Sequence, residues 1–278
     1  MRQWTIDAFT NRAFGGNPAC VLEPLSEWPS DVWMQRLATE NHAGATAFIV
    51  RGDTDFRFSL RWFTASVEVP LCGHATLAAA HALFNEIRLS TDLLEFDTAS
   101  GRIGVTKTAD RLELDMPAQH AQKIAPPPAL TTALGAEPVE VWAGPYLIAI
   151  LDSPSAVRAV RPDLDALRTV SLAYGGQGNV GVAAATDGAE PYDVIDRFFA
   201  PGYGIPEDAA TGSFHCILAP IMADRLGKDM IRFHQASPER GADFICRVAN
   251  PRVLLSGEAV TILESTLRIS VDAKSHAE

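Results

Sequence analysis

The chain has 278 residues, of which 47% are hydrophobic, and its formal net charge is −11. This length and composition exclude a disordered chain and allow one large domain or two of ordinary size. The acidic balance disfavours nucleic acid and anionic membranes as partners, because both attract clustered Lys and Arg. We therefore expect a small-molecule ligand.

Nothing in the sequence indicates a membrane span or an exported protein. No apolar run approaches the roughly 20 residues that crossing a bilayer requires, and the first residues have neither the basic start nor the apolar core of a secretion signal. Four cysteines stand far apart without a C-x-x-C pair, as is typical of free thiols in a reducing compartment: Cys20, Cys72, Cys216 and Cys246. We expect a cytoplasmic protein without disulfides.

The chain begins with short runs of β-branched and aromatic residues bounded by Gly, Asn, Asp and Pro, which predict strands. These runs are residues 4–9, 19–24, 45–50 and 56–64. Between the second and the third, Ser30 and Asp31 open a segment with apolar residues at helical spacing, so we expect a surface helix there. Its apolar residues are Trp33, Met34 and Leu37.

A second helix is expected over residues 73–84, where small apolar residues occur on every side. A helix without a polar face is typical of burial, so it should lie inside a wrapped sheet. The proline-rich segment 121–130 cannot continue a strand or a helix and predicts an extended connector. We place the domain boundary there, which gives domains 1–120 and 121–278, although the last strand could return to the first domain.

The pattern then recurs in the second half. Residues 61–64, which lead to Gly73, resemble residues 197–200, which lead to Gly212. Each set precedes a helix of small apolar residues, so we expect two similar domains that face each other, each a sheet wrapped round a helix. The alternative is a coincidence between two apolar helices.

Both helices would begin with glycine near the interface of the two domains. The backbone N–H groups of a helix N-terminus attract a carboxylate or a developing enolate. Gly73 and Gly212 would therefore bind one small anion together. Either glycine alone could serve only to allow a tight turn.

Ionisable side chains gather at these helix starts: Cys72, His74, Glu207, Asp208 and His215. Either carboxylate could be an ordinary helix cap, and a cysteine is often a small core residue. A thiol just before a helix N-terminus is nevertheless more readily ionised, and a histidine at a helix mouth is placed to touch a ligand. The His and Cys spacings match no compact ligand motif, so we expect neither metal nor cofactor.

Several motifs, in this order along nearly the whole chain, resemble the PhzF family of phenazine-biosynthesis isomerase-like proteins. They are Asp7–Phe9, Gly16–Ala19, Glu40–Asn41, Thr46–Phe48, Val69–Thr76, Arg197–Gly202, Glu207–Ser213 and His215–Cys216. The resemblance implies a diaminopimelate-epimerase-like α+β fold. That fold has two β-barrels, each wrapped round a central apolar helix, and usually occurs as a homodimer without a cofactor.

The resemblance also implies an activity. Characterised members isomerise a dihydro-hydroxyanthranilate with a glutamate that moves a proton between ring carbons, while a His, an Asp and a Ser at the helix mouths position the substrate. His74, Asp208 and Ser213 match the supporting positions. The glutamate does not match, because Ala45 stands in its place. Losing a positioned general base typically costs on the order of 10²–10⁴-fold in rate.

Related epimerases and racemases offer a second template, in which one cysteine precedes each glycine-led helix. Cys72 matches the first of these positions and Thr211 occupies the second. A lone thiol opposite a threonine resembles the dehydratase variants of that superfamily more than its racemases.

Three functions therefore stay open. The first is a PhzF-like isomerase of a small carboxylated metabolite, in which Asp208, His74 or Cys72 moves the proton and Gly73, Gly212, Ser213 and Thr211 bind the substrate. The second is a non-catalytic protein that kept the anion pocket, and the third is a Cys72-based dehydratase or epimerase. A scaffold protein is disfavoured because the sequence has no charge stripe.

Overall fold

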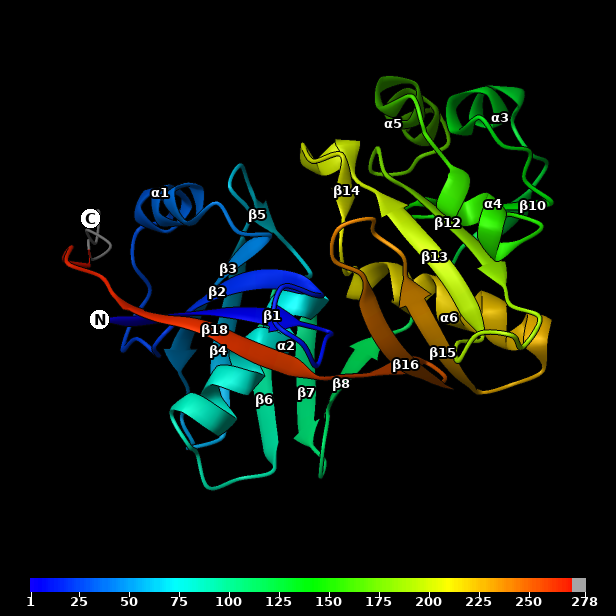
Figure 1. Ribbon diagram of the computed structural model, residues 1–278. Coiled ribbons are helices and arrows are strands. Elements are labelled where there is room, and N and C mark those ends of the chain that lie inside the picture. The colour runs from blue at the N-terminus through cyan, green and yellow to red at the C-terminus, as the bar shows by residue number, and fades with distance from the viewer. Residues whose placement is uncertain (272–278) are drawn as a thin grey trace. The chain divides into compact units, whose positions relative to one another are not determined.

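The computed structural model describes residues 1–271. The chain divides into two compact units, one formed by Met1–Met116 together with the residues from Ser256 onward, the other by Pro117–Leu255. Each unit combines a mixed sheet with helices, which is an α+β architecture (Figure 1).

The strands of the first unit form one mixed sheet. They are β1 (Arg2–Ala8), β2 (Asn17–Leu22), β3 (Ala45–Arg51), β4 (Arg57–Phe63), β5 (Glu68–Val69), β6 (Leu93–Thr98), β7 (Gly101–Lys107), β8 (Leu112–Pro117) and β18 (Ala259–Thr266). Their order is β18, β1, β2, β3, β4, β6, β7, β8, and β5 pairs with the end of β4. Only the β2–β3 and β4–β6 pairs are parallel. Helices α1 (Asp31–Asn41) and α2 (Gly73–His81) lie in the two crossovers that parallel pairing requires.

The second unit is built in the same way. Its strands are β9 (Gln122–Ile124), β10 (Glu140–Ala143), β11 (Leu147–Ile150), β12 (Val180–Ala185), β13 (Val194–Phe199), β14 (Glu207–Asp208), β15 (Met230–Gln235) and β16 (Ala242–Ala249), and β17 (Arg252–Gly257) spans the residues where the first unit resumes. Its helices are α3 (Pro128–Leu134), α4 (Pro154–Ala159), α5 (Leu164–Ala173) and α6 (Gly212–Leu226), with short turns at Ala82–Glu86 in the first unit and Pro201–Tyr203 in the second.

The two sheets repeat one topology. In the second unit the order is β9, β10, β11, β12, β13, β15, β16, with β14 on the end of β13 and with β11–β12 and β13–β15 as the parallel pairs. This is the order of the first unit from β18 to β7, strand for strand. The duplication predicted from the motifs is confirmed, and α6 occupies the place of α2.

Both predicted helices of the first half are confirmed, and their burial differs as their sequences require. Helix α1 is capped by Ser30, whose hydroxyl accepts a hydrogen bond from the Trp33 N–H, and it buries only one side. The first eight residues of α2 are all buried. Helix α2 packs against β1, β2, β3 and β18, and α6 packs against β15 and β16, all strands of their own units (Figure 1).

The proline-rich segment differs from the sequence-based expectation. Residues 121–130 are not an extended connector, because Gln122–Ile124 forms β9 and Pro128 begins α3. Proline is tolerated at the first position of a helix, where its missing N–H would have no partner and its fixed φ suits the helix.

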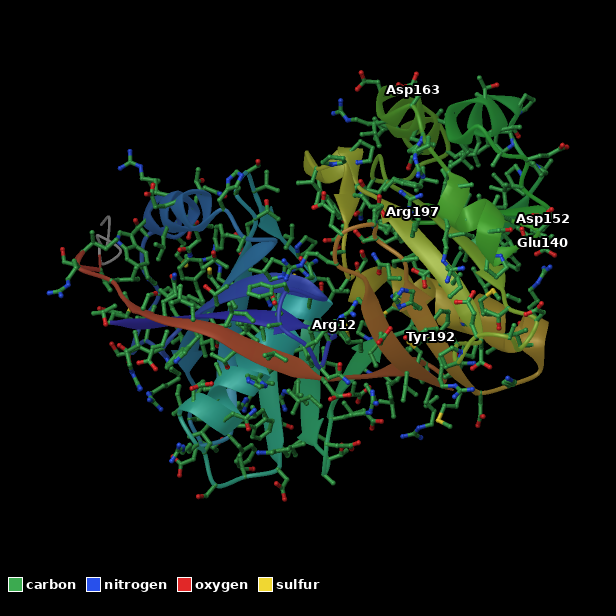
Figure 2. The ribbon with its side chains drawn as sticks, in the orientation of Figure 1. Arg12, Glu140, Asp152, Asp163, Tyr192 and Arg197 are labelled. Atoms are coloured by element: carbon green, nitrogen blue, oxygen red, sulfur yellow. The ribbon has the colours of Figure 1, made fainter. Side chains whose placement is uncertain are left out.

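A buried ion pair joins β13 to β14, the short strand before α6. Arg197, labelled in Figure 2, lies on β13. It donates two hydrogen bonds to the Glu207 carboxylate, at 2.9 and 2.7 Å, and a third to the Val160 carbonyl at the end of α4, at 2.8 Å. Arg61 and Glu68 form the matching pair before α2. The side chains of Arg197 and Glu207 are 4% and 16% exposed, against 21% and 39% for Arg61 and Glu68.

This difference in burial predicts different stability costs. Arg197→Met should lower the free energy of unfolding by about 3 kcal/mol, because it leaves a poorly hydrated Glu207 carboxylate without its cation. Arg61→Met, the matched control, should cost no more than about 1 kcal/mol, because water replaces the lost partner. Urea unfolding of the two variants measures the difference. Equal losses would contradict this account of the buried pair.

Candidate functional site

The first unit gathers three polar side chains at the start of α2. Cys72 is the residue just before the helix, and its side chain makes no capping hydrogen bond. Its Sγ lies 3.5 Å from Nδ1 of His74, and Nδ2 of Asn17 lies 3.3 Å from the same nitrogen. Cys72 is 7% exposed and His74 6%, so both are nearly buried but still reach the surface of the unit.

Cys72 and His74 are close enough to exchange a proton. The Cys72 sulfur lies 3.5 Å from Nδ1 of His74 and 3.9 Å from its Nε2. An unprotonated Nδ1 has a single lone pair, for which the thiol and the Asn17 amide compete. Transfer of the thiol hydrogen would leave a thiolate at the positive end of α2, where the helix dipole favours an anion.

The segment that carries Ala45 lies against the His74 imidazole. Ala45 is the first residue of β3, pairs with Ala19 of β2 and is 1% exposed. At Gly44 an added Cβ would lie 3.2 Å from Nε2 of His74 and would clash with Oδ1 of Asn17. Glycine therefore lets the backbone just before Ala45 approach the His74 ring.

The other three cysteines are poor proton carriers. All four cysteines are free and buried, as predicted from their spacing. Burial raises the pKa of Cys20 above its usual value, raises that of Cys216 to about 12 and raises that of Cys246 well beyond its usual range. These three stay thiols near neutral pH.

The second unit places Asp208, Thr211 and Ser213 at the start of α6. Oδ2 of Asp208 accepts a 2.7 Å hydrogen bond from the Thr211 hydroxyl. Oγ of Ser213 lies 3.0 Å from the hydroxyl of Tyr146, and burial raises the pKa of this tyrosine above its usual value, so it stays a neutral phenol. Glu207 is occupied by Arg197 and is not free to carry a proton.

His215, the remaining histidine near a helix mouth, belongs to the core. Its ring is fully buried and stacks on Phe244 with centroids 3.9 Å apart, and its Nε2 lies 3.3 Å from Oδ2 of the equally buried Asp196. Within residues 1–271, no three His, Cys, Asp or Glu side chains are grouped to hold a metal ion. No helix in the same residues has the length and apolarity needed to cross a membrane.

Sequence reasoning missed three residues of these clusters: Asn17, Tyr146 and Gln235. Asn17 lies inside the motif Gly16–Ala19, and this motif could have indicated Asn17 as a candidate site residue. Tyr146, just before β11, and Gln235, at the end of β15, are brought to α6 by the sheet, and no local pattern marks them.

Comparison with known proteins agrees with the motifs. The family described as phenazine biosynthesis-like protein matches residues 6–265. The chain belongs to this family. It is 42% identical over 266 residues to an uncharacterized isomerase of Pseudomonas aeruginosa, a match that covers 95% of this chain and 97% of that protein.

Solved structures of the family superpose closely. A PhzF-family phenazine biosynthesis protein of Enterococcus faecalis is 35% identical, with a TM-score of 0.87 over 96% of this chain and 99% of that one. A hydroxyproline epimerase of Agrobacterium vitis is only 14% identical, with a TM-score of 0.58 over 95% of this chain and 91% of that one, so it shares the fold alone.

The close approach at Gly44 can be tested directly. Gly44→Ala should lower the free energy of unfolding by about 1–3 kcal/mol, because the new methyl must displace Asn17 or the His74 ring in a packed site. Gly104→Ala is the matched control, since its nearest neighbour would be the Asp115 Cβ at 3.9 Å, an ordinary contact. Denaturant unfolding compares the two, and a harmless Gly44→Ala would show that the segment does not touch His74.

Proposed function

We propose that the chain is a PhzF-family isomerase that moves a proton on a small carboxylated substrate without a cofactor. In this proposal Cys72 and His74 together act as the general base in place of the missing glutamate. The observation that carries this proposal is the 3.5 Å contact between Cys72 Sγ and His74 Nδ1. The P. aeruginosa relative named an isomerase supports the reaction class.

The proposed reaction needs one base that first takes a proton and then returns it. The Cys72 thiol gives its hydrogen to Nδ1 of His74, and the thiolate then removes a proton from a carbon conjugated with the substrate carboxylate. The resulting enolate is stabilised by helix N–H groups. The thiol returns the proton to a different carbon, so atoms and charge balance without another reactant.

Residues of both units take part in this proposal, as the family resemblance implies. His74, Asp208 and Ser213 would position the substrate, and the N–H groups at Gly73 and Gly212 would bind its carboxylate. We also propose that each sheet closes as a barrel round its helix, and that the protein acts as a cytoplasmic homodimer.

The hydrogen bonds of Thr211 argue against a two-base epimerase. Its hydroxyl hydrogen is donated to Asp208, and its oxygen accepts from the amide of Gln235. A hydroxyl engaged in both directions is a poor acid or base on the second face of a carbon. Thr211 therefore favours one-base chemistry at Cys72, either isomerisation or dehydration.

A non-catalytic binding protein is the second candidate, and the buried methyl group of Ala45 favours it. An anion pocket could survive without the carboxylate that moved the proton. The two candidates differ in proton exchange, because only an enzyme should exchange a substrate C–H with deuterium from heavy water.

Restoring the carboxylate should raise proton transfer. We expect Ala45→Glu to increase deuterium incorporation into a dihydro-hydroxyanthranilate, followed by NMR, by on the order of 10²–10⁴-fold over the parent. Ala45→Gln is the control, with nearly the same size but no basic oxygen, and should give no gain. Adding Asp208→Asn to Ala45→Glu should abolish the gain. If Ala45→Glu and Ala45→Gln behave alike, position 45 is not beside the reacting carbon.

The parent's own base is tested at Cys72. Cys72→Ala should reduce the exchange catalysed by the parent to the uncatalysed rate, because no other thiol is at the helix mouth. Cys20→Ala is the matched control and should exchange like the parent. Exchange that survives Cys72→Ala would assign the base elsewhere, and absence of exchange in the parent with retained binding of 3-hydroxyanthranilate would favour the binding protein.

A further inference from the structure

Gln235 is a fully buried amide that the family motifs do not include, and it holds the turn between Asp208 and α6. It is the last residue of β15 and is 0% exposed. Its Oε1 accepts from the Thr211 N–H at 2.8 Å, and its Nε2 donates to the Asp208 carbonyl at 2.7 Å and to the Thr211 hydroxyl oxygen at 3.1 Å.

Two backbone groups fix which way the amide points. A backbone N–H can only donate, so it must face Oε1, and a carbonyl can only accept, so it must face Nε2. A flipped amide would put two donors together and two acceptors together. The second hydrogen of Nε2 therefore goes to the Thr211 oxygen.

The direction of the next hydrogen bond follows. The Thr211 hydroxyl has one hydrogen, and its oxygen already accepts from Gln235. That hydrogen goes to Oδ2 of Asp208, at 2.7 Å. The hydrogen-bond chain from Gln235 through Thr211 therefore holds the Asp208 carboxyl group in one orientation.

His215 holds the third polar group of Thr211. Nδ1 of His215 lies 2.9 Å from the Thr211 carbonyl and must carry a hydrogen, because a carbonyl cannot donate. The N–H, hydroxyl and carbonyl of Thr211 are thus all engaged by buried side chains or by Asp208. The residue before α6 cannot turn without breaking several buried hydrogen bonds, each of which is expensive to leave unmade.

We propose that Gln235 is a positioning residue that acts through Thr211 to orient Asp208 toward the substrate. The proposal rests on the proposed function in that Asp208 contacts the substrate. A misplacement of about 1 Å in such a group can cost on the order of 10²-fold in rate, so a buried clamp on it controls activity without touching substrate.

The exchange experiment uses matched substitutions in the full-length protein. Thr211→Val removes only the hydroxyl, and Gln235→Met removes the amide at similar volume. Both should slow deuterium exchange into the dihydro-hydroxyanthranilate by on the order of 10²-fold. Thr211→Ser keeps the hydroxyl and should slow the exchange less than Thr211→Val does. Thr186→Val, which removes a 2.7 Å hydroxyl bond to the Tyr192 carbonyl elsewhere in the unit, is the control for stability loss alone.

A double-mutant cycle separates positioning from general damage. If Gln235 acts through Asp208, Gln235→Met should add no further loss once Asp208→Asn is present. An equal loss from Gln235→Met in both backgrounds, with exchange present in the parent, would overturn the proposal.

A measurement independent of catalysis distinguishes this failure from failure of the proposed function. The side-chain carboxyl ¹³C NMR signal of Asp208 is assigned by its loss in Asp208→Asn. Thr211→Val and Gln235→Met should both move this signal, whereas Thr211→Ser and Thr186→Val should leave it in place. If the parent shows no exchange, the proposed function fails. If the Asp208 signal does not move in Gln235→Met, the positioning role is overturned, whatever the activity of the parent.

Discussion

Burying the start of a helix on every side is the constraint on which each unit depends. The first two turns of helices α2 and α6 are completely buried, including the polar residues His74, Thr76, Ser213 and His215. Each helix lies in a crossover between parallel strands and packs against strands of its own unit. The polar and ionisable side chains at each helix start must therefore find partners inside the unit.

The same constraint explains the ion pairs that precede both helices. A short strand, β5 or β14, must turn the chain from the sheet into the helix, and a bidentate Arg–Glu pair joins that strand to its neighbour in each unit. This pairing removes Glu207 from the candidates for proton transfer. Of the two neighbouring carboxylates, Glu207 is thus held by Arg197, whereas Asp208 accepts from the Thr211 hydroxyl.

The sequence predicted the parts of the fold that depend on local pattern. Helix α1 follows from Ser30 and the spacing of its apolar residues, and the buried helices follow from their small side chains. The prediction that residues 121–130 form an extended connector was wrong. Three prolines suggested an extended chain, but Pro128 suits the first position of a helix and begins α3. Gln235 and Tyr146 could not be predicted, since strands distant in sequence bring them to α6 and neither lies in a local motif.

The two helix starts are built differently, and this difference bears on the chemistry. Before α2 stands a thiol whose sulfur lies 3.5 Å from an imidazole nitrogen, a distance at which the two groups can exchange a proton. Before α6 stands Thr211, whose N–H, hydroxyl and carbonyl are all held, so its hydroxyl is fixed as a donor to Asp208. A racemase needs an acid and a base of comparable freedom on opposite faces of a carbon. A thiol next to an imidazole at one helix start, and a hydroxyl held as a donor at the other, suit chemistry in which a single group takes a proton and gives it back.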